Sequence, residues 1–456
     1  MLHVGASADK PEYRLTRTDA GWRIESADDS VGVIAAAGKQ SGIIVSDRHG
    51  VIVIGPDSAP SQSLPGSTTQ TAPAQAIDVL STRPAAPAVT LNWRSFKVGG
   101  QRVTAVAVAA DGRLAAGDAG GNVAAFLPDG NKLFQTKLDS TILSLHFVDG
   151  ELLAGEDRGA LTRFAPDGTR RWQNVIPYVP MAWPYWTEYA SRVREITSAD
   201  VNGDGRQEIL ISNSDRRVYA FDGQGTELWR ASVEWGVFTA MTAGRFGNGF
   251  GLYGGTSRPS IHGYTIIFDA TGKVRKHYSR LDIESWSIPS QFCDMRLADI
   301  DGDGQVEVIT GLDTNCRQLI AYKPGGAISW DADVAGAAQA IAIRSAANTA
   351  GQAATVYCAS AAGYVCAFDG KSGKRAWACF VGDPPAFVAP YGQDAVLAVS
   401  PSGDVAIIDG KGKLAGRNSL GTPASALLRP GDHRATGTIL VGTEDGHLLA
   451  MPSQRP

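Results

Sequence analysis

The chain has 456 residues, of which 43% are hydrophobic, and it carries a formal net charge of −4 at pH 7. A chain of this length and composition can bury a large core, which excludes a largely disordered protein. The slightly acidic balance offers no basic surface to nucleic acid or anionic lipid, so we expect neither nucleic acid nor a membrane as a partner. No apolar run is long enough to span a bilayer, and the first residues lack the pattern of a signal peptide. The chain is therefore either cytosolic or has lost a signal.

The first 88 residues divide into two parts of different composition. Residues 1–55 hold short runs of β-branched and aromatic residues between turn residues, which predicts a small β-rich segment. Residues 56–88 are rich in Pro, Ser, Thr and Ala with hardly a charge, which is typical of a linker or a surface strap. We therefore expect the main domain to occupy residues 89–456.

The main domain is built from a repeated unit. Residues 196–233 have the pattern of four short strands, broken by an acidic glycine turn, a polar tip and an Asp-Gly turn. The pattern returns at residues 297–330, and a unit that recurs in this way cannot bury its face alone. Each such unit corresponds to one propeller blade. A large apolar residue before each third turn marks eight units, at Phe126, Phe164, Phe221, Phe268, Tyr322, Phe368, Ile408 and Met451.

The eighth unit has no fourth strand, because the chain ends soon after Met451. Residues 90–98 look like the fourth strand at residues 227–233, and no first three strands precede them. We predict that this N-terminal strand completes the last blade, which closes the ring and removes the free sheet edges. The expected fold is therefore all-β, an eight-bladed β-propeller, with seven blades as the alternative.

Two acidic turns, at residues 200–208 and 299–307, carry the sharpest chemical motif. In each turn, oxygens at alternate positions, one backbone carbonyl and a final Glu can converge on a hard cation. Such an ion would be structural, since the turn ties the first strand of a blade to the second. The alternative is a pair of Asp-Gly turns whose carboxylates cap their own backbone. The expected ligands of two structural Ca2+ ions are Asp200, Asn202, Asp204, the carbonyl of Arg206 and Glu208 in one turn, and Asp299, Asp301, Asp303, the carbonyl of Gln305 and Glu307 in the other.

Three long connections are expected on one face of the ring, opposite the acidic turns. Residues 177–189 and 277–290 join neighbouring blades, and residues 256–264 form the tip of the blade between them. Long loops in a compact repeat usually have a function, and aromatic side chains stack on sugar rings, although they also form ordinary loop cores. The candidate substrate-binding residues are Trp183, Tyr185, Trp186, Tyr189, Trp235, Tyr278 and Trp286.

The repeats resemble two propeller families. Residues 219–229 and 367–377 resemble the PQQ-like repeats of quinoprotein-type propellers, and the acidic turns resemble those of the FG-GAP class, which is found also in eight-bladed rhamnogalacturonan lyases. The resemblance covers residues 89–456 and implies the fold more than the activity. The chain departs from quinoprotein dehydrogenases, since it lacks a vicinal Cys-Cys pair and is short for that class. We therefore expect no quinone cofactor.

The resemblance to propeller polysaccharide lyases favours a lyase that cleaves a uronate-containing polysaccharide by β-elimination. This reaction needs a positive charge against the carboxylate, a base for the C5 proton and an acid for the leaving oxygen. The candidate catalytic residues are Arg258 and Arg280 for the charge, His262 and His277 for the base, and Tyr264 and Tyr278 for the acid.

Two other interpretations stay open. A glycosidase needs two carboxylates at a set separation, which Glu188, Asp282 and Glu284 offer. A non-catalytic module of a larger secreted enzyme would bind glycan or protein through the same aromatic face, next to a catalytic domain outside this chain. With a polysaccharide or oligosaccharide as partner, we expect a secreted or periplasmic protein whose signal has been removed.

The cysteines add one expectation about the same face. Cys293 and Cys316 are both expected there, and they can form a disulfide if their Cα atoms lie within ~7 Å. Cys358 and Cys366 flank a hairpin tip and suit a role as small buried hydrophobes equally well.

Overall fold

The computed structural model describes six strands in the first 80 residues and most of the chain from residue 84 onward. The described residues are 13–18, 21–26, 32–36, 43–47, 50–54, 77–80, 84–178, 190–233, 237–246, 249–257, 265–278, 292–313, 318–323, 327–345, 351–427 and 437–453. These residues form no helix and therefore no helix that could cross a bilayer.

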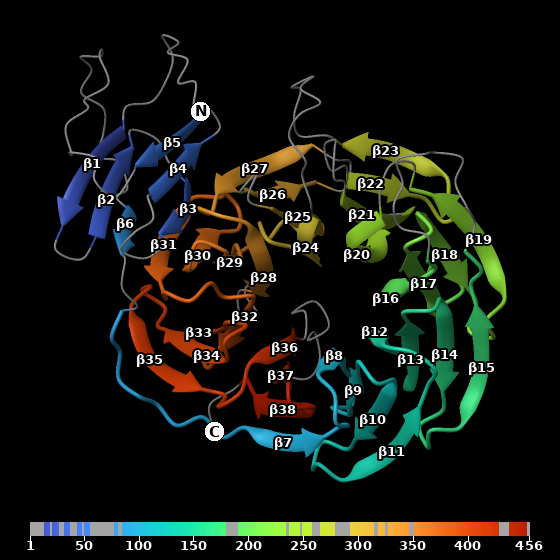
Figure 1. Ribbon diagram of the computed structural model, residues 1–456. Coiled ribbons are helices and arrows are strands. Elements are labelled where there is room, and N and C mark those ends of the chain that lie inside the picture. Colours follow the sequence, from blue (N-terminus) through green and yellow to red (C-terminus); the bar gives the residue numbers. More distant parts are fainter. Residues whose placement is uncertain are drawn as a thin grey trace.

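Eight four-stranded antiparallel sheets stand around a central axis as the blades of a propeller (Figure 1). This confirms the predicted eight-bladed, all-β fold and excludes the alternative of seven blades. Blades one to four comprise β8 (Val103–Val108), β9 (Leu114–Asp118), β10 (Asn122–Phe126) and β11 (Lys132–Lys137); β12 (Ile142–Val148), β13 (Glu151–Glu156), β14 (Ala160–Phe164) and β15 (Arg170–Val175); β16 (Val193–Ala199), β17 (Glu208–Asn213), β18 (Arg217–Phe221) and β19 (Glu227–Ser232); and β20 (Val237–Phe246), β21 (Gly249–Ser257), β22 (Thr265–Phe268) and β23 (Val274–Tyr278).

The second half of the ring continues in the same way. Blades five to eight comprise β24 (Phe292–Ala298), β25 (Glu307–Leu312), β26 (Gln318–Tyr322) and β27 (Ile328–Asp333); β28 (Ala338–Arg344), β29 (Thr355–Ser360), β30 (Tyr364–Asp369) and β31 (Arg375–Phe380); β32 (Phe387–Tyr391), β33 (Ala395–Val399), β34 (Asp404–Ile408) and β35 (Leu414–Ser419); and β36 (Ala424–Leu427), β37 (Thr438–Thr443), β38 (His447–Pro452) and β7 (Arg94–Lys97).

The six N-terminal strands form two small sheets. One contains β1 (Tyr13–Thr18), β2 (Gly21–Ser26) and β6 (Ile77–Leu80), and the other contains β3 (Gly32–Ala36), β4 (Ile43–Asp47) and β5 (Gly50–Ile54). Five of these strands lie in the segment expected to be β-rich. The sixth, β6, lies in the stretch expected to be a linker and pairs with β2.

The burial of each strand follows its place in the blade. The second strand of blade three, β17, is buried along its whole length, because the neighbouring blades cover both of its faces. The fourth strand, β19, lies at the outer edge, and four of its six residues are exposed. The apolar clusters accordingly lie between blades, as where Leu210 and Val218 of blade three meet Phe238 and Phe268 of blade four.

Aromatic residues of the fourth strands attach each blade to the next. Trp172 of blade two lies against Gly225 in the third-to-fourth turn of blade three, and Trp229 of blade three lies against Gly272 of blade four. These glycines have φ of +83° and +76°, which a side chain rarely adopts. The same contact recurs for Phe96 and Gly130, Phe134 and Gly168, Trp330 and Gly373, and Trp377 and Gly412.

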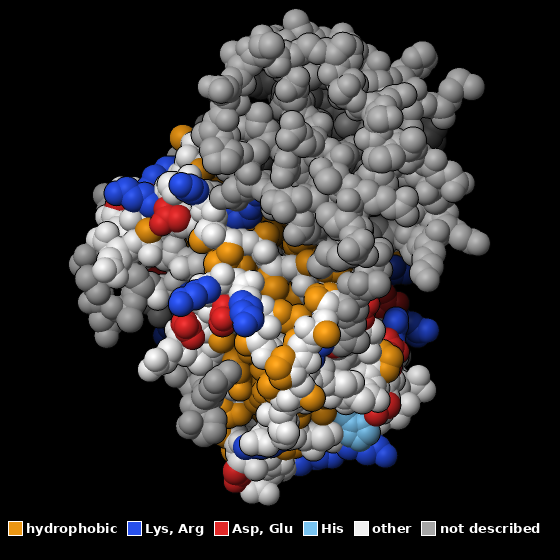
Figure 2. Space-filling view, turned by 90° about the vertical axis from the view of Figure 1, so that its left-hand side faces the viewer, with side chains coloured by type: hydrophobic (Ala, Val, Ile, Leu, Met, Phe, Trp, Pro, Cys, Tyr) orange, Lys and Arg blue, Asp and Glu red, His pale blue; other side chains and the backbone are white. Residues whose placement is uncertain are grey.

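The ring closes as the sequence predicts. The N-terminal strand β7 pairs with β38, with Phe96 opposite Leu448, so the fourth strand of blade eight comes from the other end of the propeller. The segment before it, residues 84–93, runs along blade seven, where the N–H of Val89 donates to the carbonyl of Arg417 at 2.8 Å. Hydrophobic side chains gather on this outer side of the molecule below the part drawn in grey (Figure 2).

Candidate functional site

The acidic turn of blade three joins β16 to β17, and its carboxylates hold the backbone of the turn. Asp200 accepts hydrogen bonds from the N–H groups of Gly203 at 2.6 Å and Gly205 at 3.2 Å. The buried Glu208 accepts one from the N–H of Val201 at 2.7 Å. The self-capping that the alternative interpretation expects is therefore present.

The acidic turn of blade five joins β24 to β25 and repeats this scheme residue by residue. Asp299 accepts hydrogen bonds from Gly302 at 2.8 Å and Gly304 at 2.9 Å. Glu307, which has no exposed surface, accepts one from the N–H of Ile300 at 3.0 Å. The two turns share one backbone arrangement, so any chemical difference between them comes from their other side chains.

In blade three, the neutral side-chain amide of Asn202 contacts the carboxylate oxygens that accept no backbone N–H group. Asn202 Nδ2 lies 3.3 Å from Asp204 Oδ2 and 3.3 Å from Glu208 Oε1. The amide oxygen of Asn202 accepts the N–H of Asp204, and the second carboxylate oxygen of Asp204 accepts the N–H of Arg206, each at 2.8 Å. The contacts of the amide are long, so they hold these oxygens weakly.

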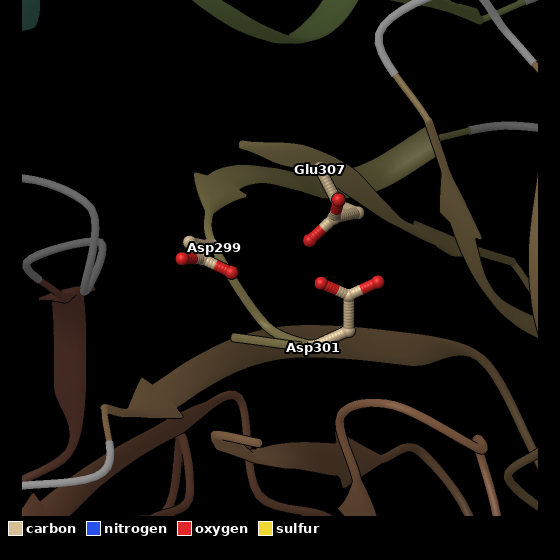
Figure 3. Close-up of side chains that lie close together, drawn as sticks. All are labelled: Asp299, Asp301 and Glu307. Atoms are coloured by element: carbon tan, nitrogen blue, oxygen red, sulfur yellow. The ribbon is translucent and has the colours of Figure 1, made fainter. Parts of the chain in front are cut away.

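In blade five, a lysine takes the corresponding place. Lys323 follows β26, and its Nζ lies 2.6 Å from Asp301 Oδ2, 2.9 Å from Asp303 Oδ2 and 2.9 Å from Glu307 Oε1. The carboxylates of Asp299, Asp301 and Glu307 point toward one another (Figure 3), with ligand oxygens within 4.8 Å of each other. The chain's own ammonium group thus lies among the acids of this turn.

The pKa values of these groups reflect this contact. Burial raises the pKa of Glu307, although the N–H of Ile300 and the Lys323 ammonium act against it. The hydrogen bond from Lys323 lowers the pKa of Asp303. Burial lowers the pKa of Lys323, but hydrogen bonds to the three carboxylates outweigh burial and raise it above the usual lysine range. Lys323 is therefore an ammonium ion at neutral pH.

The donor set of blade three fits a calcium ion by its chemistry. Calcium takes roughly six to eight oxygen ligands from carboxylates, amides, backbone carbonyls and water. Three carboxylates, the amide oxygen of Asn202 and the carbonyl of Arg206 are of these kinds, and most of the turn is exposed to water. In blade five, Lys323 already binds the three free oxygens, so that set does not fit a calcium ion while Lys323 is in place.

The residues predicted for catalysis and sugar binding fall where the structure gives no side chains. His277 and Tyr278 lie at the end of β23, opposite Ile266 and Thr265, and only their backbone is described. The remaining ones lie outside the described residues, namely Arg258, His262, Tyr264 and Arg280, and Trp183, Tyr185, Trp186, Tyr189, Trp235 and Trp286. These assignments stay predictions, as does the Cys293–Cys316 bridge, since Cys316 is also outside the described part.

The described strand ends do fix where these segments attach. Residues 176–192 and 279–291 connect a fourth strand to the first strand of the next blade, and residues 258–264 connect β21 to β22. In an antiparallel meander, these two kinds of connection leave the sheet at the same end. The end of the first connection is held on the tip of blade three, because Ser214 donates from its N–H to Arg192 and from its hydroxyl to Ala190.

The tip of blade three also carries a polar group that the sequence reveals only in part. Asn213, Asp215 and Arg217 are recognisable as polar tip residues, but Tyr219 is not. Its hydroxyl donates to the buried Asp215, and Arg217 Nη1 lies 3.2 Å from the same carboxylate. Burial, followed by the contact with Asp215, raises the pKa of Tyr219. The alternation of a strand, which places residues 217 and 219 on one face, is the available signal.

Comparisons with known proteins agree with this architecture. Residues 152–243 match the family model of the lambda-carrageenase β-propeller domain, and residues 298–451 match the model described as outer membrane protein assembly factor BamB. No curated protein matches the chain. The first match contains the acidic turn of blade three and the connection at residues 177–189, and the second contains the acidic turn of blade five.

Several solved structures have the same fold at low sequence identity. Sqt1 of Saccharomyces cerevisiae has a TM-score of 0.60 and 13% identity, covering 78% of this chain and 97% of that one. BamB from Moraxella catarrhalis has a TM-score of 0.56 and 14% identity, covering 79% and 96%. The computationally designed Ika8 protein has a TM-score of 0.55 and 14% identity, covering 78% and 98%. The chain is thus a β-propeller with PQQ-like repeats.

Proposed function

We propose that this propeller is the carbohydrate-binding part of a carbohydrate-active protein and that it holds an anionic polysaccharide on the face formed by blades two to five. The match of residues 152–243 to the lambda-carrageenase propeller domain supports this most directly. That match includes Trp183, Tyr185, Trp186 and Tyr189. Aromatic rings on a long connection are suited to stacking on sugars.

Three arginines lie on the described part of this face. Arg158 at the tip of blade two is exposed. Arg192 is half-exposed and lies 3.1 Å from Asp157, while Arg217 pairs with the buried Asp215. A carboxylate or sulfate group of a polymer can pair with such arginines through two parallel hydrogen bonds.

The finer form of the proposal is β-elimination on a uronate. Arg258 or Arg280 would neutralise the sugar carboxylate and so acidify its C5 proton. His262 or His277 would remove that proton, and Tyr264 or Tyr278 would protonate the leaving oxygen.

A second candidate is a propeller that binds proteins without catalysis. The match of residues 298–451 to the BamB model favours it. The two candidates differ in the residues on which binding depends, since the first needs the aromatic connections and the second does not.

A binding assay with three polymers tests the proposal. We expect affinity electrophoresis to show retardation by lambda-carrageenan or polygalacturonate but not by neutral dextran, and Trp186→Ala to abolish it. Leu228→Ala, at an exposed site on the outer strand β19, is the matched control. No retardation by either acidic polymer would contradict the proposal.

Turnover separates the enzyme from the module. If the chain is a lyase, polygalacturonate gains the ultraviolet absorbance of unsaturated ends, and Arg258→Ala and His262→Ala lose it without a change in melting temperature. Binding without such absorbance would identify a non-catalytic module.

A further inference from the structure

Blade five differs from its neighbours at one position, the residue that follows the large residue ending the third strand. Four blades have an aspartate there that caps its own turn: Asp222, Asp269, Asp369 and Asp409 accept hydrogen bonds from N–H groups two to four residues later. Blade five has Lys323 instead. Its side chain contacts the acidic turn of the same blade.

Lys323 supplies the hydrogen-bond donors that the carboxylates of the acidic turn do not obtain from the backbone. Asp301 and Asp303 each place one oxygen on a backbone N–H, at 3.0 Å and 2.7 Å, and Glu307 places one on Ile300. The second oxygen of each of these carboxylates accepts from Lys323 Nζ. A lysine ammonium has three protons, so all of its donors are used here.

A second difference between the two turns matches the first. Where blade three has the neutral Asn202, blade five has Asp301, which adds one negative charge. Of the three carboxylates, Asp301 is the one closest to Lys323, at 2.6 Å. The extra acid and the extra base therefore occur together in one blade and are both absent from the other.

We propose that Lys323 is the cation of the blade-five turn: its tethered ammonium takes the position that a calcium ion would otherwise occupy, so this turn needs no metal. A calcium ion bound here would lie about 2.3–2.6 Å from oxygens that Lys323 now contacts, and its charge would repel the ammonium. The ion could enter only by displacing Lys323. Blade three has Asp222 at this position and keeps its acidic turn open to a metal.

Calcium counting on Lys323→Met tests the proposal, because methionine keeps the length of the side chain and removes its charge. We expect isothermal titration with calcium to find one more ion per chain in this variant than in the wild type. Its melting temperature in EGTA should fall several degrees below that of the wild type, and calcium should restore it by binding the folded state. Lys411→Met, at an exposed lysine of the corresponding turn in blade seven, should behave like the wild type.

The expected result is the difference in bound calcium between Lys323→Met and the wild type. This difference does not depend on whether blade three binds a metal. Asp204→Asn in both backgrounds removes the contribution of blade three. No additional calcium in Lys323→Met would overturn the proposal. It would also be overturned if Asp303→Asn removed a calcium ion from the otherwise wild-type chain, and this second measurement does not require Lys323→Met to fold.

Discussion

At the scale of single residues, the reactivity of three cysteine thiols away from the candidate site should report how well they are buried. Cys358 and Cys366 lie opposite each other on β29 and β30, and both are buried, as is Cys379. Burial raises the pKa of Cys366 to about 11 and that of Cys379 to about 12, and it raises the pKa of Cys358 as well. Since the thiolate is the reactive form, these three cysteines should resist Ellman's reagent at pH 8 in the folded protein.

Thiol counting before and after denaturation measures this. A thiol with a pKa near 11 is ionised in only about one molecule in a thousand at pH 8, whereas an unfolded thiol ionises in roughly a quarter. The three groups should therefore become reactive only on unfolding, and mapping of the labelled peptides identifies them. Fast labelling of Cys366 in the native protein would show that blade six opens locally.

The candidate ligands show what can and cannot be predicted at this scale. The spacing of residues 299–307 is enough to predict an acidic turn with converging carboxylates, because all of its members lie within one short segment. Lys323 belongs to a different turn, 16 residues after Glu307, and no local pattern connects the two. Only the pairing of β25 with β26 brings them together.

At the scale of the element, the contact between a fourth-strand aromatic and the next blade's turn glycine should govern stability. A methyl group on Gly272 would lie 2.5 Å from Cε3 of Trp229, at a φ of +76°. Gly421 has a similar φ of +77°, but a methyl group there would meet nothing within 4 Å. Both Gly→Ala changes impose about 1–2 kcal/mol of left-handed strain, and only the first adds overpacking of about 1–3 kcal/mol.

Urea denaturation of the two variants isolates the contact between the blades. We expect Gly272→Ala to unfold at the lower urea concentration, because its free energy of unfolding is reduced further by the overpacking alone. Equal midpoints would mean that Trp229 moves aside freely and that the contact contributes little.

The sequence marks the aromatic partner of this contact in most blades but not in all, and it does not mark the contact itself. Fourth-strand residues such as Trp172, Trp229 and Trp330 recur at one position, so the sequence marks them. In blade four that position holds Lys276, which is opposite Ile267. In blade seven it holds Gly416, and Val89 of the N-terminal strap fills the space over it. A residue supplied from more than 300 positions away has no signature within the repeat.

At the scale of the whole molecule, the structure confirms the predicted ring, whereas the predicted binding face stays a prediction. The ring follows from eight similar units, each of which constrains the interpretation of the others. The connections at residues 177–189 and 279–291 occur once each, so no repeat constrains them. The candidate functional residues are for that reason assigned by residue type and face alone.

Ring closure carries the last prediction. The strand β7 pairs with β38 on its outer side, Phe96 lies against Gly130 of blade one, and Val98 is buried between blades eight and one. A chain that starts at Gly99 loses all three and exposes the N–H and C=O groups of β38, which invites pairing between molecules. A chain that starts at Pro84 retains them, together with the strap on blade seven. We expect the shorter chain to melt well below the longer one and to aggregate on heating, as followed by circular dichroism and light scattering. If the two chains melt together, blade eight is stable with three strands and the ring does not depend on β7.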